Sequence, residues 1–134
     1  MPRMIFVNLP IANLKVSVDF FAGLGFTFNA QFTSEDTTCM IVNELASVML
    51  LEKKRFAEFT PKTIVDATQQ TECLIAVSCD SRAAVEEMMK KALSSGGTEH
   101  KPPQDMGFMY SHSFQDPDGH VWEPMWMNPA HVVG

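Results

Sequence analysis

The chain of 134 residues lacks two features that would place it in or across a membrane. No stretch approaches the roughly 20 consecutive apolar residues that span a bilayer. The N-terminus also lacks the basic segment, apolar core and cleavage site of a signal peptide. We therefore expect a cytoplasmic protein that does not use a membrane as a partner.

Positive charge is scarce. The sequence holds ten Lys and Arg against 16 Asp and Glu, for a formal net charge of −6, of which residues 1–70 carry −1 and residues 71–134 carry −5. The one basic run, Lys53-Lys54-Arg55, is short. Such a balance repels phosphate backbones and anionic lipids, and it attracts cations at long range. We expect no nucleic-acid partner.

Cysteine is also rare, with three residues and no CxxC spacing. An odd number without paired spacing argues against a disulfide framework or a zinc site. Cys39, Cys73 and Cys79 lie in apolar, β-prone segments, which favours reduced cysteines in the core.

The residues that are present predict a globular protein with an internal repeat. With 46% hydrophobic residues the chain can bury a core. A β-prone run over 4–9 precedes a helix that Asn13 caps and Gly25 ends, and three short β-prone runs follow over 26–32, 38–42 and 46–51. Residues 1–51 therefore read as a βαβββ module.

The same order of elements returns after a polar connection over residues 52–70. A strand over 73–79 precedes a helix that Asp80 or Ser81 caps and Gly96-Gly97 ends. A short edge strand over 98–101 and strands over 109–115 and 120–127 complete a second module within 71–128. We predict an α+β fold of two βαβββ modules in a single domain over 1–134. A ferredoxin-like βαββαβ sandwich is the alternative, but it leaves two strands unplaced.

Three motifs resemble the vicinal oxygen chelate superfamily, which holds glyoxalase I, bleomycin-resistance proteins, fosfomycin-resistance transferases and extradiol dioxygenases. They are Leu9-Pro-Ile-Ala-Asn-Leu14 before the first helix, Leu74-Ile-Ala-Val-Ser78 before the second, and Asp116-Pro-Asp-Gly-His-Val-Trp-Glu123 at the last hairpin. The third is the most specific. The run Trp122-Glu-Pro-Met-Trp-Met127 resembles a branch labelled lactoylglutathione-lyase-related.

The resemblance implies that the two modules form a curved mixed sheet shaped as a cup, that the protein is a homodimer, and that a metal is held from four strands. Carried over residue by residue, the four ligand positions fall on Phe6, Leu50, Leu74 and Glu123. Only Glu123 offers a donor atom, whereas a protein site for Zn²⁺, Ni²⁺ or Fe²⁺ needs three or more. The nearest other donors, Asn8 and Glu52, lie two residues beyond Phe6 and Leu50. We expect no cofactor, with a divalent metal as the disfavoured option.

Glu123 is the candidate catalytic residue, as a general base or a former ligand position; the alternative is a solvated strand residue. The turn Asp116-Pro-Asp-Gly119 favours a type I turn with a glycine bulge, which places Ser113 opposite Glu123; a two-residue turn would place His112 there instead. With the bulged turn and the superfamily's use of this strand, we expect His112 to be packed or at the rim. Together with the positions carried over from the superfamily, the expected ligand-binding residues are Phe6, Asn8, Leu50, Leu74, Met109, Ser111, Ser113 and Met125.

Three functions remain open at this point. The first is a superfamily member that binds a small organic molecule in its cup without metal. The second is a metal-dependent enzyme of the lactoylglutathione-lyase type, acting on a hemithioacetal with Glu123 as base or ligand. The third is a metal-free enzyme that uses Glu123 with Ser111 or Ser113. We expect Lys53-Lys54-Arg55 to be a solvated face or, alternatively, an anion clamp, and His100, His120 and His131 to be surface residues.

Overall fold

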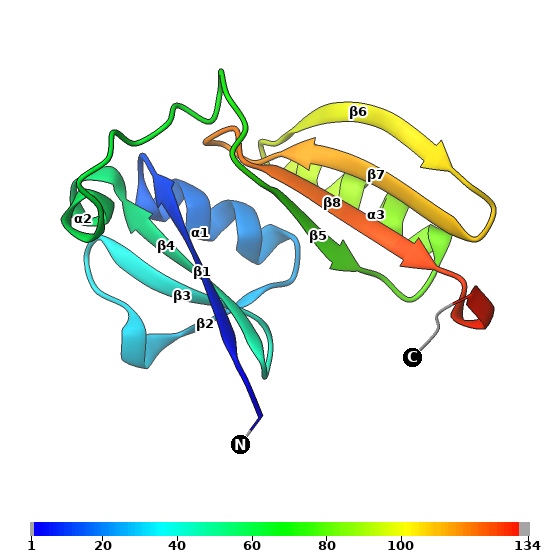
Figure 1. Ribbon diagram of the computed structural model, residues 1–134, viewed down its shortest axis with the longest axis horizontal. Coiled ribbons are helices and arrows are strands. Elements are labelled where there is room, and N and C mark those ends of the chain that lie inside the picture. The colour runs from blue at the N-terminus through cyan, green and yellow to red at the C-terminus, as the bar shows by residue number, and fades with distance from the viewer. Residues whose placement is uncertain (1, 132–134) are drawn as a thin grey trace. The chain divides into compact units, whose positions relative to one another are not determined.

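The computed structural model describes residues 2–131, and the chain divides into two compact units, Met1–Asp66 and Ala67–Gly134. Each unit contains one four-stranded mixed sheet with one longer helix (Figure 1). The element order in each is β-α-β-β-β, so the predicted repeat is confirmed. Because each unit has its own sheet, the ferredoxin-like alternative is wrong.

The N-terminal unit pairs its strands in the order β1-β4-β3-β2. Strands β1 and β4 run parallel and the other pairs antiparallel. Two short helical turns follow β4. The bounds are β1 Ile5–Ile11, α1 Leu14–Gly23, β2 Thr27–Asn29, η1 Ala30–Phe32, β3 Thr37–Asn43, β4 Ala46–Glu52, α2 Lys53–Phe56 and η2 Ala57–Phe59.

The C-terminal unit repeats this topology with the order β5-β8-β7-β6. Here β5 and β8 are the parallel pair. The bounds are β5 Leu74–Ser78, α3 Arg82–Ser94, β6 Thr98–Asp105, β7 Met109–Gln115, β8 Val121–Met127 and η3 Pro129–His131. None of the helices formed by residues 2–131 is long and apolar enough to cross a bilayer.

Local sequence signals set the limits of both longer helices. The side chain of Asn13 accepts a hydrogen bond from the N–H of Val16, and that of Ser81 accepts one from the N–H of Ala84. These bonds satisfy donors that have no partner within the helix. After α1, Gly25 adopts a positive φ of 98°, which a glycine takes without strain.

Each unit buries its own apolar core between its helix and its sheet. In the N-terminal unit Phe20 and Phe21 of α1 are buried together with Leu9, Ile11 and Leu50. In the C-terminal unit Val85 and Met89 of α3 are buried, as are Phe114 and Trp122. Burial of such side chains removes apolar area from water and holds each helix against its sheet.

Five details differ from the sequence-based expectation. Strand β1 continues through Pro10, which the ladder tolerates because β1 is an edge strand. The predicted strand over 26–32 ends at Asn29 and gives way to η1, and the connection after residue 52 begins with α2. Strand β6 is longer than expected and fully exposed, with Pro102 and Pro103 on its sequence. Cys39 is buried, but Cys73 is exposed, so the core prediction is wrong for Cys73.

Candidate functional site

One face of the N-terminal sheet is covered by α1. Glu52, the last residue of β4, lies on this face, because its Oε2 accepts a hydrogen bond from the N–H of Leu14 at 2.8 Å. Leu50 is two residues earlier, shares the face, pairs with the core residue Leu9 and is 0% exposed. Leu50 is therefore part of the core under α1.

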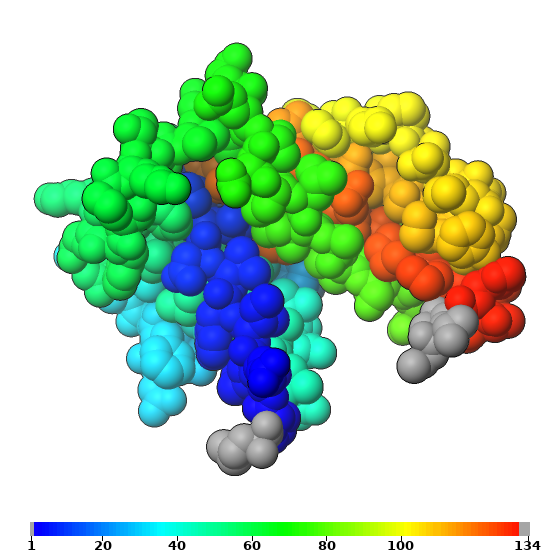
Figure 2. Space-filling model, in the orientation of Figure 1, coloured from blue at the N-terminus to red at the C-terminus, as the bar shows by residue number. Residues whose placement is uncertain are grey.

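The opposite face of the same sheet carries the other two candidates from this unit. Phe6 pairs with Ser47 and Asn8 pairs with Met49 across the parallel β1–β4 ladder. These four side chains share one face because strand residues alternate. Phe6 is 48% exposed, and the start of β1 lies at the surface (blue in Figure 2). On β4, the residue that lies beside Asn8 on this face is therefore Met49.

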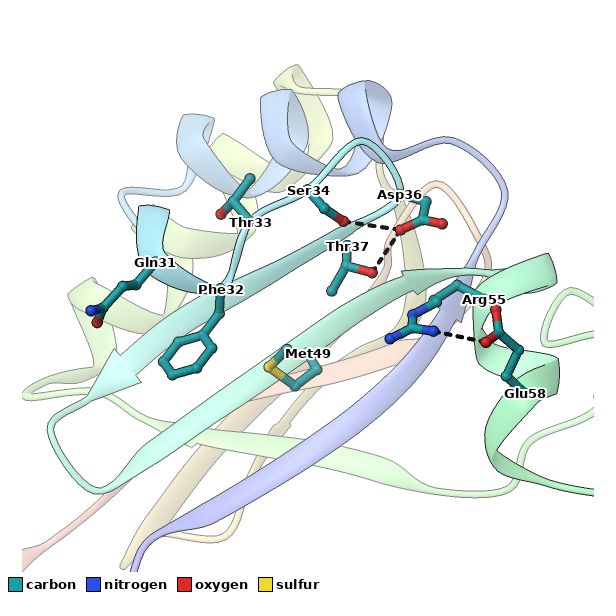
Figure 3. Close-up of a pocket in the computed structure, with 9 residues that line it drawn as sticks. All are labelled: Gln31, Phe32, Thr33, Ser34, Asp36, Thr37, Met49, Arg55 and Glu58. Atoms are coloured by element: carbon teal, nitrogen blue, oxygen red, sulfur yellow. Dashed lines mark hydrogen bonds and ion pairs between the residues drawn. The ribbon is translucent and has the colours of Figure 1, made fainter.

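A pocket of about 480 Å³ opens beside Met49 (Figure 3). Its walls come from η1 and the loop after it, the start of β3, the middle of β4, and the two helical turns after β4. It is lined by Gln31, Phe32, Thr33, Ser34, Asp36, Thr37, Met49, Arg55 and Glu58. The pocket combines an aromatic ring and a thioether with hydroxyl groups and three charged side chains.

The charged groups of the pocket are held in defined positions. Oδ1 of Asp36 accepts hydrogen bonds from Ser34 Oγ and Thr37 Oγ1, both at 3.0 Å. These two hydroxyl donors hold the pKa of the Asp36 carboxyl below its usual value. Arg55 Nη1 donates to Glu58 Oε1 at 2.8 Å, and its guanidinium lies 5.1 Å from the centre of the Phe59 ring.

Sequence reasoning did not identify this pocket as a unit. Its one usable signal was the run Lys53-Lys54-Arg55, whose last residue lines the pocket. The remaining polar residues follow no helical or strand period, since they come from turns and short helices.

In the C-terminal sheet, the predicted ligand-binding residues lie on the face that α3 does not cover. The antiparallel register pairs Ser111 with Met125 and Phe114 with Trp122, so Ser113 lies opposite Glu123. This is the pairing predicted for the bulged turn. On the other side of β8, Ala76 pairs with Glu123 and Leu74 with Val121. Glu123 is half-buried and Leu74 is 55% exposed.

The helix-covered face of this sheet holds His112, which is 8% exposed. Its Nδ1 lies 2.9 Å from Glu86 Oε2, and its Nε2 lies 2.7 Å from Glu99 Oε2. His112 is therefore packed between α3 and β6, as expected. His100 and His131 are exposed, and His120 is half-buried.

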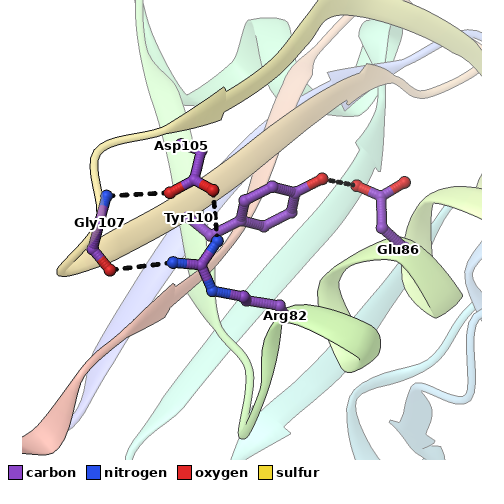
Figure 4. A network of polar contacts seen from close by, with 5 residues as sticks. All are labelled: Arg82, Glu86, Asp105, Gly107 and Tyr110. Atoms are coloured by element: carbon purple, nitrogen blue, oxygen red, sulfur yellow. Dashed lines mark hydrogen bonds and ion pairs between the residues drawn. The ribbon is translucent and has the colours of Figure 1, made fainter.

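A polar network at the start of α3 fixes the β6–β7 hairpin (Figure 4). Arg82 donates to Asp105 Oδ2 at 2.6 Å and to the carbonyl oxygen of Gly107 at 2.9 Å. Tyr110 donates its hydroxyl to Glu86 at 2.7 Å, which raises the pKa of Tyr110. The bond from Arg82 lowers the pKa of the Asp105 carboxyl. Sequence reasoning missed this network because its partners are 23 to 25 residues apart.

The side chains on the opposite faces do not fit a metal ion. On the face of the N-terminal sheet that carries Phe6, β1 and β4 offer amide, hydroxyl, thioether and apolar groups. On the face of the C-terminal sheet that carries Glu123, β5 and β8 offer hydroxyl, thioether and apolar groups and one carboxylate, Glu123. Zn²⁺, Ni²⁺ and Fe²⁺ favour imidazole, thiolate and carboxylate donors. Among residues 2–131 no three His, Cys, Asp or Glu side chains come close enough together to hold a metal.

Each unit has the order βαβββ, and in each the edge strands β1 and β5 pair in parallel with β4 and β8. Comparisons with known proteins identify the family that has this fold. Residues 3–123 match the family model described as Glyoxalase/Bleomycin resistance protein/Dioxygenase superfamily. The chain belongs to this superfamily.

Solved structures with the same fold share little sequence with the chain. The hypothetical protein SA1046 from S. aureus is 23% identical, with a TM-score of 0.80 over 94% of each chain. A glyoxalase-related enzyme from Fulvimarina pelagi is 19% identical, with a TM-score of 0.82 over 100% of this chain and 94% of that one. A glyoxalase/bleomycin resistance protein/dioxygenase family enzyme from Burkholderia phytofirmans PsJN is 16% identical, with a TM-score of 0.77 over 94% of this chain and 99% of that one. No curated protein matches the chain. These likenesses establish the fold alone.

Proposed function

We propose that this protein binds a small organic molecule without a metal ion, in the pocket beside Met49. The observation that carries the proposal is the pocket itself, about 480 Å³ in volume, with apolar and charged walls. That volume and mixture of chemistry are typical of sites for small organic ligands, in which apolar groups give affinity and a few polar groups give orientation.

Two further observations support the proposal. Asn8, one of the expected ligand-binding residues, pairs with Met49 on the same face, so the pocket adjoins that position. The ligand positions carry one carboxylate, Glu123, which is too few donors for a metal that would polarise a carbonyl. Leu74, Met109, Ser111, Ser113, Glu123 and Met125 stay predicted ligand contacts on the C-terminal sheet.

The alternative is a metal-dependent enzyme of the lactoylglutathione-lyase type. It requires an electrophile to stabilise the negative charge that forms when a proton is removed beside a carbonyl. The described residues provide no such electrophile at the predicted ligand positions. The test described next distinguishes this alternative from the proposal. A homodimer, which the resemblance implies, is tested separately by sedimentation.

The test combines metal analysis with ligand screening. Protein purified without chelator or a histidine tag is analysed for bound metals by mass spectrometry, beside a Glu123→Ala variant. The same protein, labelled with ¹³C at its methionine methyl groups, is screened against small molecules by NMR, with Met49→Leu to assign the Met49 signal. We expect no stoichiometric metal and compounds that shift the Met49 signal.

Two results would contradict the proposal. About one equivalent of Zn, Ni, Mn or Fe that is lost in Glu123→Ala would favour the lyase alternative. A screen in which no compound shifts Met49, while the protein remains folded, would exclude the pocket as the site.

A further inference from the structure

The pocket beside Met49 contains charges of both signs at different parts of its wall. Asp36 and Glu58 contribute carboxylates and Arg55 contributes a guanidinium, so the formal charge of the lining is −1. A ligand with only negative charge meets two carboxylates, and a ligand with only positive charge meets the guanidinium. The lining therefore discriminates by the arrangement of charge as well as by its sign.

The carboxylate of Asp36 has one oxygen that takes no hydrogen bond from residues 2–131. Both hydroxyl donors, Ser34 and Thr37, bond to Oδ1, and among residues 2–131 no hydrogen bond reaches Oδ2. The two bonds orient the carboxylate, and the lowered pKa of Asp36 keeps it ionised near neutral pH. An ionised, oriented carboxylate with an unused oxygen is an acceptor for an ammonium group.

Arg55 presents unused donors in the same way. The guanidinium has five N–H groups, and within the described part of the chain its only hydrogen bond goes from Nη1 to Glu58. Phe59 stacks against the guanidinium and Glu58 holds one end of it, which limits its motion. In Figure 3 the end of the guanidinium that does not contact Glu58 points toward Met49. It can donate to a carboxylate placed there.

The apolar part of the lining is exposed to solvent. Phe32 is 56% exposed, and Met49 is half-buried beside it. Covering an aromatic ring and a thioether with an apolar group removes apolar area from water, and the flexible thioether adapts to the shape of that group.

We propose that the pocket selects a zwitterion with an apolar body, of the α-amino-acid class, with its ammonium group on Asp36 Oδ2, its carboxylate on Arg55, and its side chain against Phe32 and Met49. The proposal rests on the proposed function, because it specifies the ligand class of the same pocket. It goes further in that each charge of the ligand has one named partner.

The test uses three molecules that differ only in their charged groups. L-Phenylalanine carries both charges, 2-phenylethylamine carries the ammonium alone, and 3-phenylpropanoate carries the carboxylate alone. Each is titrated into methyl-labelled protein, and dissociation constants are taken from the Met49 signal. We expect L-phenylalanine to bind on the order of tenfold or more tighter than either analogue, because each charge-assisted hydrogen bond adds to its affinity.

Two variants assign each charge to its partner. In Arg55→Gln, the advantage of L-phenylalanine over 2-phenylethylamine should disappear. In Asp36→Asn, its advantage over 3-phenylpropanoate should disappear. Lys54→Gln, which removes a neighbouring cation outside the lining, should keep both preferences. Circular dichroism and the remaining methionine signals verify that each variant is folded.

The results separate this proposal from the proposed function. Equal binding of the three molecules, no binding by any of them, or preferences that persist in both variants would overturn the zwitterion proposal. If other compounds in the screen still shift Met49, the pocket remains a ligand site of different specificity. If none does, the proposed function fails as well.

Discussion

The carboxylate of Glu52, at the end of β4, accepts a hydrogen bond from the N–H of Leu14, the first residue of α1. The distance between Oε2 and the nitrogen is 2.8 Å. This N–H is one of those that the helix leaves without an internal partner, and a negative charge at a helix N-terminus is favourable. The side chain of Glu52 is thus bound to the N-terminus of α1 on the helix-covered face of the sheet, and it points away from the opposite face.

The first prediction follows from this contact. We expect Glu52→Ala to lower the free energy of unfolding by about 1 kcal/mol, because it removes a charge-assisted bond to a helix N-terminus. Urea denaturation measures the change. Glu44→Ala removes an exposed carboxylate at the β3–β4 turn and should change stability by only a few tenths of a kcal/mol, on the order expected for surface sites. Equal effects of the two substitutions would contradict the role of Glu52.

Gly119 supplies the second prediction, because it combines a positive φ with close backbone packing. Its φ is 91°, and an added Cβ would lie 2.8 Å from the backbone of Ala67 and Thr68. Backbone atoms cannot rotate away as a side chain does. We expect Gly119→Ala to cost about 2 kcal/mol or more of unfolding free energy, from backbone strain together with the clash.

Gly96 is the matched control in the same unit. Its φ is 112°, and nothing lies within 4 Å of an added Cβ. Gly96→Ala should therefore cost about 1 kcal/mol, from the backbone conformation alone. Thermal denaturation of both variants measures the difference, and equal losses would argue that the turn moves away from Ala67 without cost.

Asp116 and Trp122 give the third prediction. The buried Asp116 carboxylate accepts hydrogen bonds from the indole Nε1 of Trp122 at 3.0 Å and from the N–H groups of Asp118 and His120. Asp116→Ala leaves a buried indole N–H without this acceptor, which costs about 1–3 kcal/mol. Chemical denaturation measures the loss, and Asp80→Ala, at an exposed aspartate in the same unit, is the control. Equal stability of the two variants would mean that water replaces the carboxylate.

The repeat and its helices could be predicted because their signals are local. Asn13 and Ser81 cap helices at the predicted positions, and Gly25 follows α1. The turn Asp116-Pro-Asp-Gly119 specifies the register of its hairpin, so Ser113 is placed opposite Glu123 as predicted. Each of these features depends on residues within a few positions of one another.

The site could be predicted only in part, because its geometry depends on long-range pairing. On β4, Leu50 and Met49 are both apolar, and a shift of one residue moves a side chain to the other face of the sheet. The sequence offers no local feature that selects Met49. The pocket itself joins η1 to Arg55 and Glu58 across a gap of more than 20 residues, and its polar residues follow no period.

The fourth prediction concerns the pH dependence of stability at the β6–β7 hairpin. Arg82 Nη1 lies 2.6 Å from Asp105 Oδ2, and its guanidinium lies over the rings of Tyr110 and Trp126. The bond from Arg82 lowers the pKa of Asp105 below the value of about 3.9 that an aspartate has in an unfolded chain. The folded state therefore holds its proton on Asp105 less tightly than the unfolded state does.

The sign of the effect follows from proton linkage. A lowered pKa in the folded state contributes stability above pH of about 3.9, and this contribution is lost as the pH falls through the folded-state pKa. We expect Asp105→Asn to be less stable than the parent protein at pH 6, with the difference shrinking steadily towards pH 2.5. Thermal denaturation across this range measures it. Asp80→Asn, at an exposed aspartate just before α3, is the control for the loss of one surface carboxylate. A difference for Asp105→Asn that stays constant with pH would mean that Asp105 acts through the shape of its contact with Gly107, whose N–H donates to Oδ1, rather than through its charge.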